Sequence, residues 1–236
     1  MTSFPPPASA TPAPELPEPD PGWAPACVVF DCDGVLMDTE ETWAEVQRVV
    51  SERNGLGFAE ADRRRMMGWS AADVATAIAE AAGADRAAVH ADVLRTEERL
   101  LSGRFVPLDG ALETVRAFAQ RVPVAVASNS TRTILGVKLE QAGFAPHLAT
   151  WVSADDVPRG KPAPDIYAEA VRRLGFAPAE ALAVEDSVVG ATSAVAAGLV
   201  VLGVPAVPGD DPLPAHLRAD SLTAPALREL LARWLG

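Results

Sequence analysis

Short apolar runs recur along the chain from residue 27 onward, and most are followed by a segment with the apolar spacing of a helix. Continuous runs predict strands buried on both faces, because a half-exposed strand would alternate apolar and polar residues. Alternation of such strands with helices is typical of a parallel sheet covered on both sides. We therefore expect an α/β fold with a Rossmann-like parallel-sheet core. The predicted strands lie at 27–31, 122–128, 149–154, 181–186 and 199–204.

One long interval interrupts this alternation. Roughly ninety residues separate the first two apolar runs, and most of them, about 40 to 104, have only helical patterns. An interval of that length is too long for a crossover between neighbouring strands. It predicts a helical cap domain at 39–104, inserted into a core that is formed by 27–38 and 105–236.

The first 26 residues form a separate segment. They contain nine of the chain's 21 prolines and have neither a basic N-terminal region nor an apolar stretch, which argues against a signal peptide. We expect residues 1–26 to be a disordered, extended linker that buries little surface. A ligand for a Pro-binding domain is the alternative interpretation of this segment.

Charge and composition exclude several classes of partner. The net charge of −12 disfavours a nucleic-acid or anionic-membrane surface. No apolar run approaches the roughly 20 residues that span a bilayer. The only cysteines, Cys27 and Cys32, form neither a disulfide framework nor a metal-binding spacing, which favours a reducing, cytoplasmic location. No protein partner is evident from the sequence.

Polar side chains gather where the predicted strands end. Ligands of open α/β sheets bind beyond the carboxyl ends of the strands, so we expect these side chains to lie at one edge of the sheet. They are Asp31 and Asp33 after the first run, Ser128 and Asn129 after the second, Lys161 after the third, and Glu185 and Asp186 at the end of the fourth.

The two aspartates of the first cluster need a chemical explanation. Side chains alternate along a strand, so Asp31 and Asp33 should lie side by side with Cys32 turned away. Two carboxylates so close together are unfavourable unless a cation or a shared proton relieves them. Helix capping is the other interpretation of acidic residues here, and we assign that role to Asp38 and Thr39, which directly precede a helical pattern.

Four motifs in this order resemble those of the haloacid dehalogenase superfamily of phosphotransferases. They are "DCDGVLMDTE", "ASNSTR", "KPAPD" and "VEDSVVGATSAVAAG", and the resemblance extends from about residue 27 to 205. The predicted helical insert lies where the small-substrate subgroup of that family, which includes β-phosphoglucomutase and sugar phosphatases, has its helical cap.

The resemblance implies a role for each motif residue. Asp31 would attack phosphorus and form an aspartyl-phosphate. Asp33 would protonate the leaving oxygen and then deprotonate the attacking water. Lys161 would place a compact positive charge on the nucleophile and the phosphoryl oxygens. Ser128 and Asn129 would donate hydrogen bonds to those oxygens.

A divalent cation is part of the same expectation. A phosphate dianion meets an anionic nucleophile only with cations present, and Mg²⁺ prefers hard oxygen ligands. The implied ligands are Asp31, the backbone carbonyl of Asp33 and Asp186, with Glu185 acting through a water.

The cap sequence and the scarcity of lysine narrow the choice of reaction. The only lysines, Lys138 and Lys161, lie outside the insert, which excludes the Schiff-base phosphonate hydrolases of the family. Dehalogenation would leave Asp33 without a role.

Met67 and Ala71 stand where a mutase would have a lysine and an arginine. We therefore expect a Mg²⁺-dependent phosphatase of a small phosphorylated metabolite, with a sugar phosphate favoured. A phosphosugar mutase and a catalytically silent binding module are the alternatives.

Overall fold

The core of the protein is a six-stranded sheet in which all neighbouring strands are parallel. The structure is a computed structural model that describes residues 16–100, 105–205 and 213–235. The strand order is β3-β2-β1-β4-β5-β6, so β1 lies near the centre between β2 and β4. The strands are β1 (Cys27–Phe30), β2 (Val124–Ser128), β3 (Thr150–Ser153), β4 (Ala181–Glu185), β5 (Val200–Gly203) and β6 (Leu217–Arg218).

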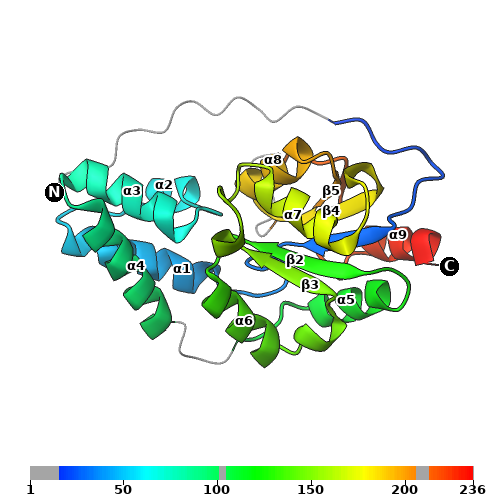
Figure 1. Cartoon of the computed structure of the whole chain (residues 1–236), viewed down its shortest axis with the longest axis horizontal. Coiled ribbons are helices and arrows are strands. Elements are labelled where there is room, and N and C mark those ends of the chain that lie inside the picture. Colours follow the sequence, from blue (N-terminus) through cyan, green and yellow to red (C-terminus); the bar gives the residue numbers. More distant parts are fainter. Residues whose placement is uncertain (1–15, 101–104, 206–212, 236) are drawn as a thin grey trace.

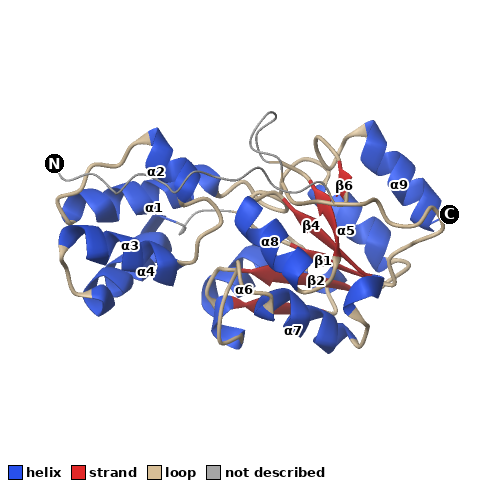
Figure 2. Cartoon of the chain, turned by 90° about the horizontal axis from the view of Figure 1, so that it is seen from above, coloured by secondary structure: helices blue, strands red, loops and turns tan. Residues whose placement is uncertain are grey.

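Helices cover both faces of this sheet (Figures 1 and 2). Val28 and Phe30 of β1 face one layer of apolar side chains, whereas Cys27 and Val29 face the other, as expected for a strand that is buried on both sides. The first layer is contributed by α5 (Ala111–Ala119), α6 (Arg132–Gln141) and α9 (Pro225–Leu235), and the second by α7 (Asp165–Leu174) and α8 (Val188–Ala196). The predicted α/β class with a parallel-sheet core is confirmed. The short strand β6 was not predicted, because two residues carry no periodicity.

Four further helices form a separate layer beside the sheet (Figure 1). They are α1 (Glu40–Arg53), α2 (Glu60–Arg65), α3 (Ala71–Ala82) and α4 (Arg86–Leu100), called the cap below. The cap has its own apolar cluster, which includes Val46, Val50, Ile78 and Val93. The predicted boundary after residue 104 lies outside the described residues. No described helix has the length and apolar character that crossing a membrane requires.

The end of the Pro-rich segment packs on the core, which corrects the expectation of a free linker through residue 26. The indole nitrogen of Trp23 donates a hydrogen bond of 3.1 Å to the carbonyl of Ala179. The indole nitrogen of Trp234 donates another of 3.1 Å to the carbonyl of Trp23, and the two rings meet edge to face at 5.9 Å. The contacts of Trp23 thus fix this end of the segment to the core despite the Pro-rich sequence around it. Residues 1–15 lie outside the described part of the chain.

Candidate active site

The turn after β1 brings two acidic residues together at the carboxyl edge of the sheet. The backbone nitrogen of Asp31 donates a hydrogen bond of 2.9 Å to the carbonyl of Val184, so Asp31 follows the end of β1 directly beside β4. The chain then turns at Gly34, which has a φ of 88°. A Cβ at that position would overlap the carboxylate of Asp186. Glycine therefore allows the turn to approach Asp186 closely.

Lys161 lies between two of the predicted site carboxylates. Its Nζ is 2.5 Å from Oδ1 of Asp31 and 2.7 Å from Oε1 of Glu185, and its side chain is only 3% exposed. The hydroxyl of Tyr167 donates a hydrogen bond of 2.7 Å to the same Glu185 oxygen. Burial raises the pKa of Asp31 to about 7, with Lys161 opposing the shift and Glu185 adding to it. Three sequence motifs thus meet in one buried network.

Asp31, Glu185 and Asp186 form an acidic cluster that fits a divalent cation. Each offers a carboxylate oxygen, and these oxygens lie within 4.8 Å of one another. Oδ1 of Asp186 is buried and has no hydrogen-bond partner among the described residues. Burial, together with Glu185 and Asp31, raises the pKa of Asp186 well above its usual range. Three carboxylates around the one ammonium of Lys161 leave surplus negative charge, and carboxylate oxygens are the ligands that Mg²⁺ prefers.

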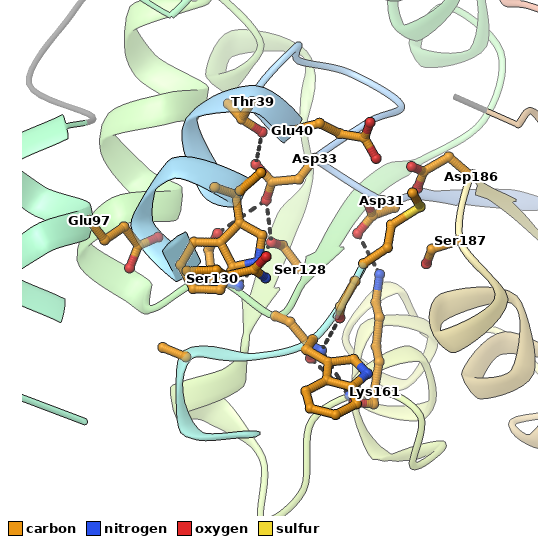
Figure 3. Close-up of a pocket in the computed structure, with 18 of the residues that line it drawn as sticks. Asp31, Asp33, Thr39, Glu40, Glu97, Ser128, Ser130, Lys161, Asp186 and Ser187 are labelled. Atoms are coloured by element: carbon orange, nitrogen blue, oxygen red, sulfur yellow. Dashed lines mark hydrogen bonds and ion pairs between the residues drawn. The ribbon is translucent and has the colours of Figure 1, made fainter. Parts of the chain in front are cut away.

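Asp33 has a different set of partners. Its carboxylate accepts hydrogen bonds from Thr39, from Ser128 at 3.3 Å and from Ser130 at 3.1 Å. Nζ of Lys138 lies 2.5 Å from its Oδ1. Burial would raise the pKa of Asp33, but the charge and hydrogen bond of Lys138, together with the hydrogen bonds of Thr39 and Ser130, outweigh it and lower the pKa. Figure 3 shows the carboxylates of Asp31 and Asp33 directed to different sides of the pocket.

Thr39 does not cap the helix that it precedes. It occupies the N-cap position of α1, but its side chain makes no capping hydrogen bond. Its hydroxyl donates to Asp33 instead. The capping role assigned to Thr39 is therefore wrong, because the nearby carboxylate of Asp33 is the stronger acceptor.

Asn129 joins three segments of the chain. Its side-chain nitrogen donates to the carbonyl of Gly68 at 2.9 Å and to that of Lys161 at 3.2 Å, while its Oδ1 accepts from the Lys161 backbone nitrogen at 2.8 Å. The predicted donation from this side chain to phosphoryl oxygens conflicts with these contacts, because both of its amide hydrogens are already used. In this conformation Asn129 holds the Lys161 loop and the tip of the cap.

Two residues of the Asp33 network were absent from the sequence prediction. Ser130 lies two residues beyond Ser128, past the end of the predicted strand. Lys138 is buried on α6 beside Leu135 and Leu139. The chain has only two lysines, and one of them lies on the apolar face of a predicted helix. That position could have identified Lys138 as a candidate site residue from the sequence.

The site opens into a cavity between the sheet edge and the cap. All the predicted site residues except Glu185 line it on the core side. The cap side includes two tryptophans, a methionine and a small number of polar residues, of which Glu40 and Glu97 are labelled in Figure 3. These tryptophan, methionine and polar residues are Glu40, Trp43, Gln47, Arg63, Met67, Trp69 and Glu97.

Comparison with known proteins gives a family and several relatives. A family model described as haloacid dehalogenase-like hydrolase matches residues 25–198. A bifunctional riboflavin kinase/FMN phosphatase of Arabidopsis thaliana is 31% identical over 215 residues, which cover 89% of this chain but only 55% of that protein. A phosphorylated carbohydrates phosphatase of Thermotoga maritima is 31% identical over 178 residues, covering 73% of this chain and 81% of that protein.

A solved structure supports the fold independently. A β-phosphoglucomutase of Clostridium difficile superposes with a TM-score of 0.77 and 16% identity, covering 89% of this chain and 97% of that one. At that identity the likeness shows a common fold and leaves the activity to be argued from the site.

Proposed function

The chain belongs to the haloacid dehalogenase-like hydrolases, and from that premise we propose that it is a Mg²⁺-dependent phosphatase of a small phosphorylated metabolite, with a sugar phosphate favoured. One observation carries the proposal. Asp31 is buried against Lys161, in a cluster with Asp186, whose Oδ1 lacks a hydrogen-bond partner among the described residues. A nucleophile, a cation and a buried carboxylate oxygen available to a metal ion are the parts that phosphoryl transfer needs.

In the first step a carboxylate oxygen of Asp31 attacks phosphorus in line with the leaving group. The bond between phosphorus and the leaving oxygen breaks, and that oxygen takes a proton from Asp33. The product alcohol departs and an aspartyl-phosphate remains on Asp31. Lys161 fixes the orientation of Asp31 through the 2.5 Å contact with its Oδ1, which reduces the entropy cost of reaching the reactive geometry.

In the second step water attacks the phosphorus of the aspartyl-phosphate. Asp33 accepts the proton of that water, and the bond between phosphorus and Asp31 breaks. Inorganic phosphate leaves, and both aspartates return to their starting protonation states. The same carboxyl group serves as acid and then as base, as a two-step displacement requires.

Asp31 and Asp186, with the backbone carbonyl of Asp33, would hold the metal ion. When bound, Mg²⁺ offsets the negative charge that the phosphoryl group and the nucleophile bring together. Both oxygens of Glu185 accept hydrogen bonds from the chain, from Lys161 and Tyr167 on one side and from Ser187 on the other. These contacts support a water-mediated role for Glu185 rather than direct ligation.

The relatives support the reaction class and leave the substrate open. Both relatives reported above carry phosphatase names, one for FMN and one for phosphorylated carbohydrates. The chain spans about half of the first, so the activities of that whole protein do not transfer to it. The mutase alternative is disfavoured, because Met67 and Ala71 stand where a mutase would bind a second phosphate.

The test is turnover of p-nitrophenyl phosphate and a panel of sugar and polyol phosphates, with Mg²⁺ and with a chelator. Wild-type protein should release phosphate only with Mg²⁺, and Asp31→Asn should lose several orders of magnitude in kcat. Asp38→Asn is the matched control, because Asp38 is exposed on the same loop. Phosphate release by Asp31→Asn at the wild-type rate would exclude the mechanism. An inert wild-type protein would favour the binding module.

A further inference from the structure

Glu97 occupies a position in the cap where an apolar residue would be expected. It follows Val89 and Val93 at intervals of four along α4, which places all three on the same face of the helix. All three are buried, and Glu97 is only 4% exposed. The other two belong to the apolar cluster of the cap. A carboxyl group therefore interrupts a buried apolar stripe.

This carboxyl group has no partner within the described chain. No hydrogen bond or ion pair of Glu97 occurs among the residues that the structure describes. Burial raises its pKa to about 7, with Lys138 opposing the shift and Asp33 adding to it. A mostly buried carboxyl group that lines a cavity and makes no hydrogen bond to the described residues is a candidate for ligand binding.

Glu97 faces the part of the cavity where the leaving group would lie. Figure 3 shows its carboxyl group directed toward the side of the pocket that holds Asp33 and Ser130. In the proposed mechanism Asp33 donates a proton to the leaving oxygen. The rest of the leaving group therefore extends from the carboxyl group of Asp33 toward the cap. Trp43 lines the same cavity and offers an apolar surface. An apolar wall with a small number of convergent polar groups is typical of a site for a small molecule.

We propose that Glu97 is a specificity residue that accepts hydrogen bonds from hydroxyl groups of the leaving group, so that the chain prefers monophosphates of polyols or sugars and rejects substrates with a second phosphate. The inference rests on the proposed phosphatase function and adds the substrate class. Hydroxyl groups donate hydrogen bonds to a carboxylate, whereas a second phosphate brings another anion. Two anions that meet beside a mostly buried carboxyl group repel each other more strongly than they would in bulk water.

The nearest alternative is that Arg63 binds a second phosphate. Its guanidinium lies 3.9 Å from a carboxylate oxygen of Glu40 and 3.7 Å from one of Glu60. Its side chain is also 35% exposed. Two neighbouring carboxylates and solvent thus compete for its charge. The cap wall therefore favours hydroxyl groups over a distal phosphate.

The test compares substrates that differ in hydroxyl and phosphate content. Glycerol phosphates and hexose monophosphates carry hydroxyls, fructose 1,6-bisphosphate carries a second phosphate, and p-nitrophenyl phosphate has no hydroxyl groups on its leaving group. Glu97→Leu continues the apolar stripe and Glu97→Gln keeps the volume without the charge. Glu98→Gln is the matched control, because Glu98 is the exposed neighbour.

Glu97→Leu should lower kcat/KM for the hydroxyl-bearing monophosphates by about 10- to 100-fold, the range for a lost hydrogen bond to a charged group. It should change p-nitrophenyl phosphate by less than about twofold. Glu97→Gln should raise the ratio of bisphosphate to monophosphate turnover about tenfold, and Glu98→Gln should change neither.

Equal scaling of all substrates by Glu97→Leu and Glu97→Gln would overturn the inference while the phosphatase function stands. A wild-type protein that is inert on every phosphate ester would overturn the phosphatase function and, with it, this inference.

Discussion

The side-chain nitrogen of Asn129 donates a hydrogen bond of 2.9 Å to the backbone carbonyl of Gly68, so a residue of the sheet domain holds the tip of the cap. Gly68 has a φ of 73°, and a Cβ there would lie 3.0 Å from Oγ of Ser187. The tip therefore also packs closely against the loop after β4. Because Asn129 bonds the backbone of Lys161 as well, the position of the cap and that of Lys161 depend on the same side chain.

Loss of this contact should loosen the cap and slow the reaction. We expect Asn129→Ala to lower kcat/KM about tenfold, as loss of one or two hydrogen bonds of about 1 kcal/mol each implies. Amide hydrogen exchange at residues 66–70 should become faster. Gly68→Ala, which strains the backbone at positive φ, should give the same pattern. Gly57→Ala is the control, since a Cβ there would meet nothing within 4 Å. If amide hydrogen exchange at these residues were unchanged in Asn129→Ala, the hydrogen bond from Asn129 to Gly68 would not hold the cap in place.

The sequence predicted the parts of the site that follow strands. Asp31, Ser128 and Asp186 come at the ends of apolar runs or just beyond them, and parallel strands bring their carboxyl ends to one edge. That argument needs no knowledge of side-chain contacts. It predicted the sheet and one edge of the cavity, because local pattern and topology determine both.

The residues that the sequence did not predict are of two kinds. Some lie on helix faces, and others have side chains that bond a distant residue instead of a local partner. Lys138 and Glu97 lie on helices, where spacing shows that a position is buried but not what it faces across the domain. Thr39 was assigned by its local propensity to cap, and a tertiary contact with Asp33 overrode that propensity. The packing of Trp23 on the core was not predicted, because the Pro-rich composition around it is typical of a disordered segment. Each of these contacts links segments far apart in the chain or competes with a local preference.

The metal site gives a second prediction. Asp186→Asn should raise the Mg²⁺ concentration for half-maximal activity by more than about tenfold, because it replaces an anionic oxygen ligand with a neutral one. Calorimetric Mg²⁺ binding should weaken in parallel, which is a readout independent of turnover. Asp220→Asn, at an exposed position, should change neither value. Wild-type Mg²⁺ affinity in Asp186→Asn would remove this residue from the ligand set.

The packing of the Pro-rich segment gives a third prediction, for stability alone. Trp23→Ala should lower the free energy of unfolding by about 2 kcal/mol, less than for a fully buried tryptophan because Trp23 is only half-buried. Its contacts reach Trp234 and, through it, Phe118 behind the sheet. Urea unfolding measures the loss, and kcat should stay unchanged. Pro21→Ala serves as the exposed control, and equal stability of the two variants would contradict the anchor.

Burial of Glu97 gives a fourth prediction, on the pH dependence of stability. Its pKa is raised from 4.5 to about 7 in the fold. A carboxyl group with a raised folded pKa stabilises the fold below its unfolded pKa and loses that contribution as the pH rises through the folded value. The free energy of unfolding of Glu97→Gln relative to wild type should therefore increase between pH 4.5 and 8, by on the order of 2 kcal/mol. A difference that is constant with pH would show that Glu97 is ionised normally.

The last prediction concerns the second lysine. Lys138 helps to keep the pKa of Asp33 below its usual value, so Lys138→Met should raise that pKa, because only the hydrogen bonds of Thr39 and Ser130 then oppose the effect of burial. Asp33 must be protonated to donate to the leaving oxygen, so the alkaline limb of the kcat/KM profile should move to higher pH.

Removal of this lysine should also lower the free energy of unfolding by about 2 kcal/mol. That is less than for a fully buried pair, because the side chain of Asp33 is 34% exposed. Lys138→Arg keeps the charge and should leave the alkaline limb near its wild-type position. If Lys138→Met lowers stability but does not move the limb, Lys138 supports the fold and does not set the proton affinity of Asp33. If both change together, Lys138 supports the fold and also sets the proton affinity of Asp33.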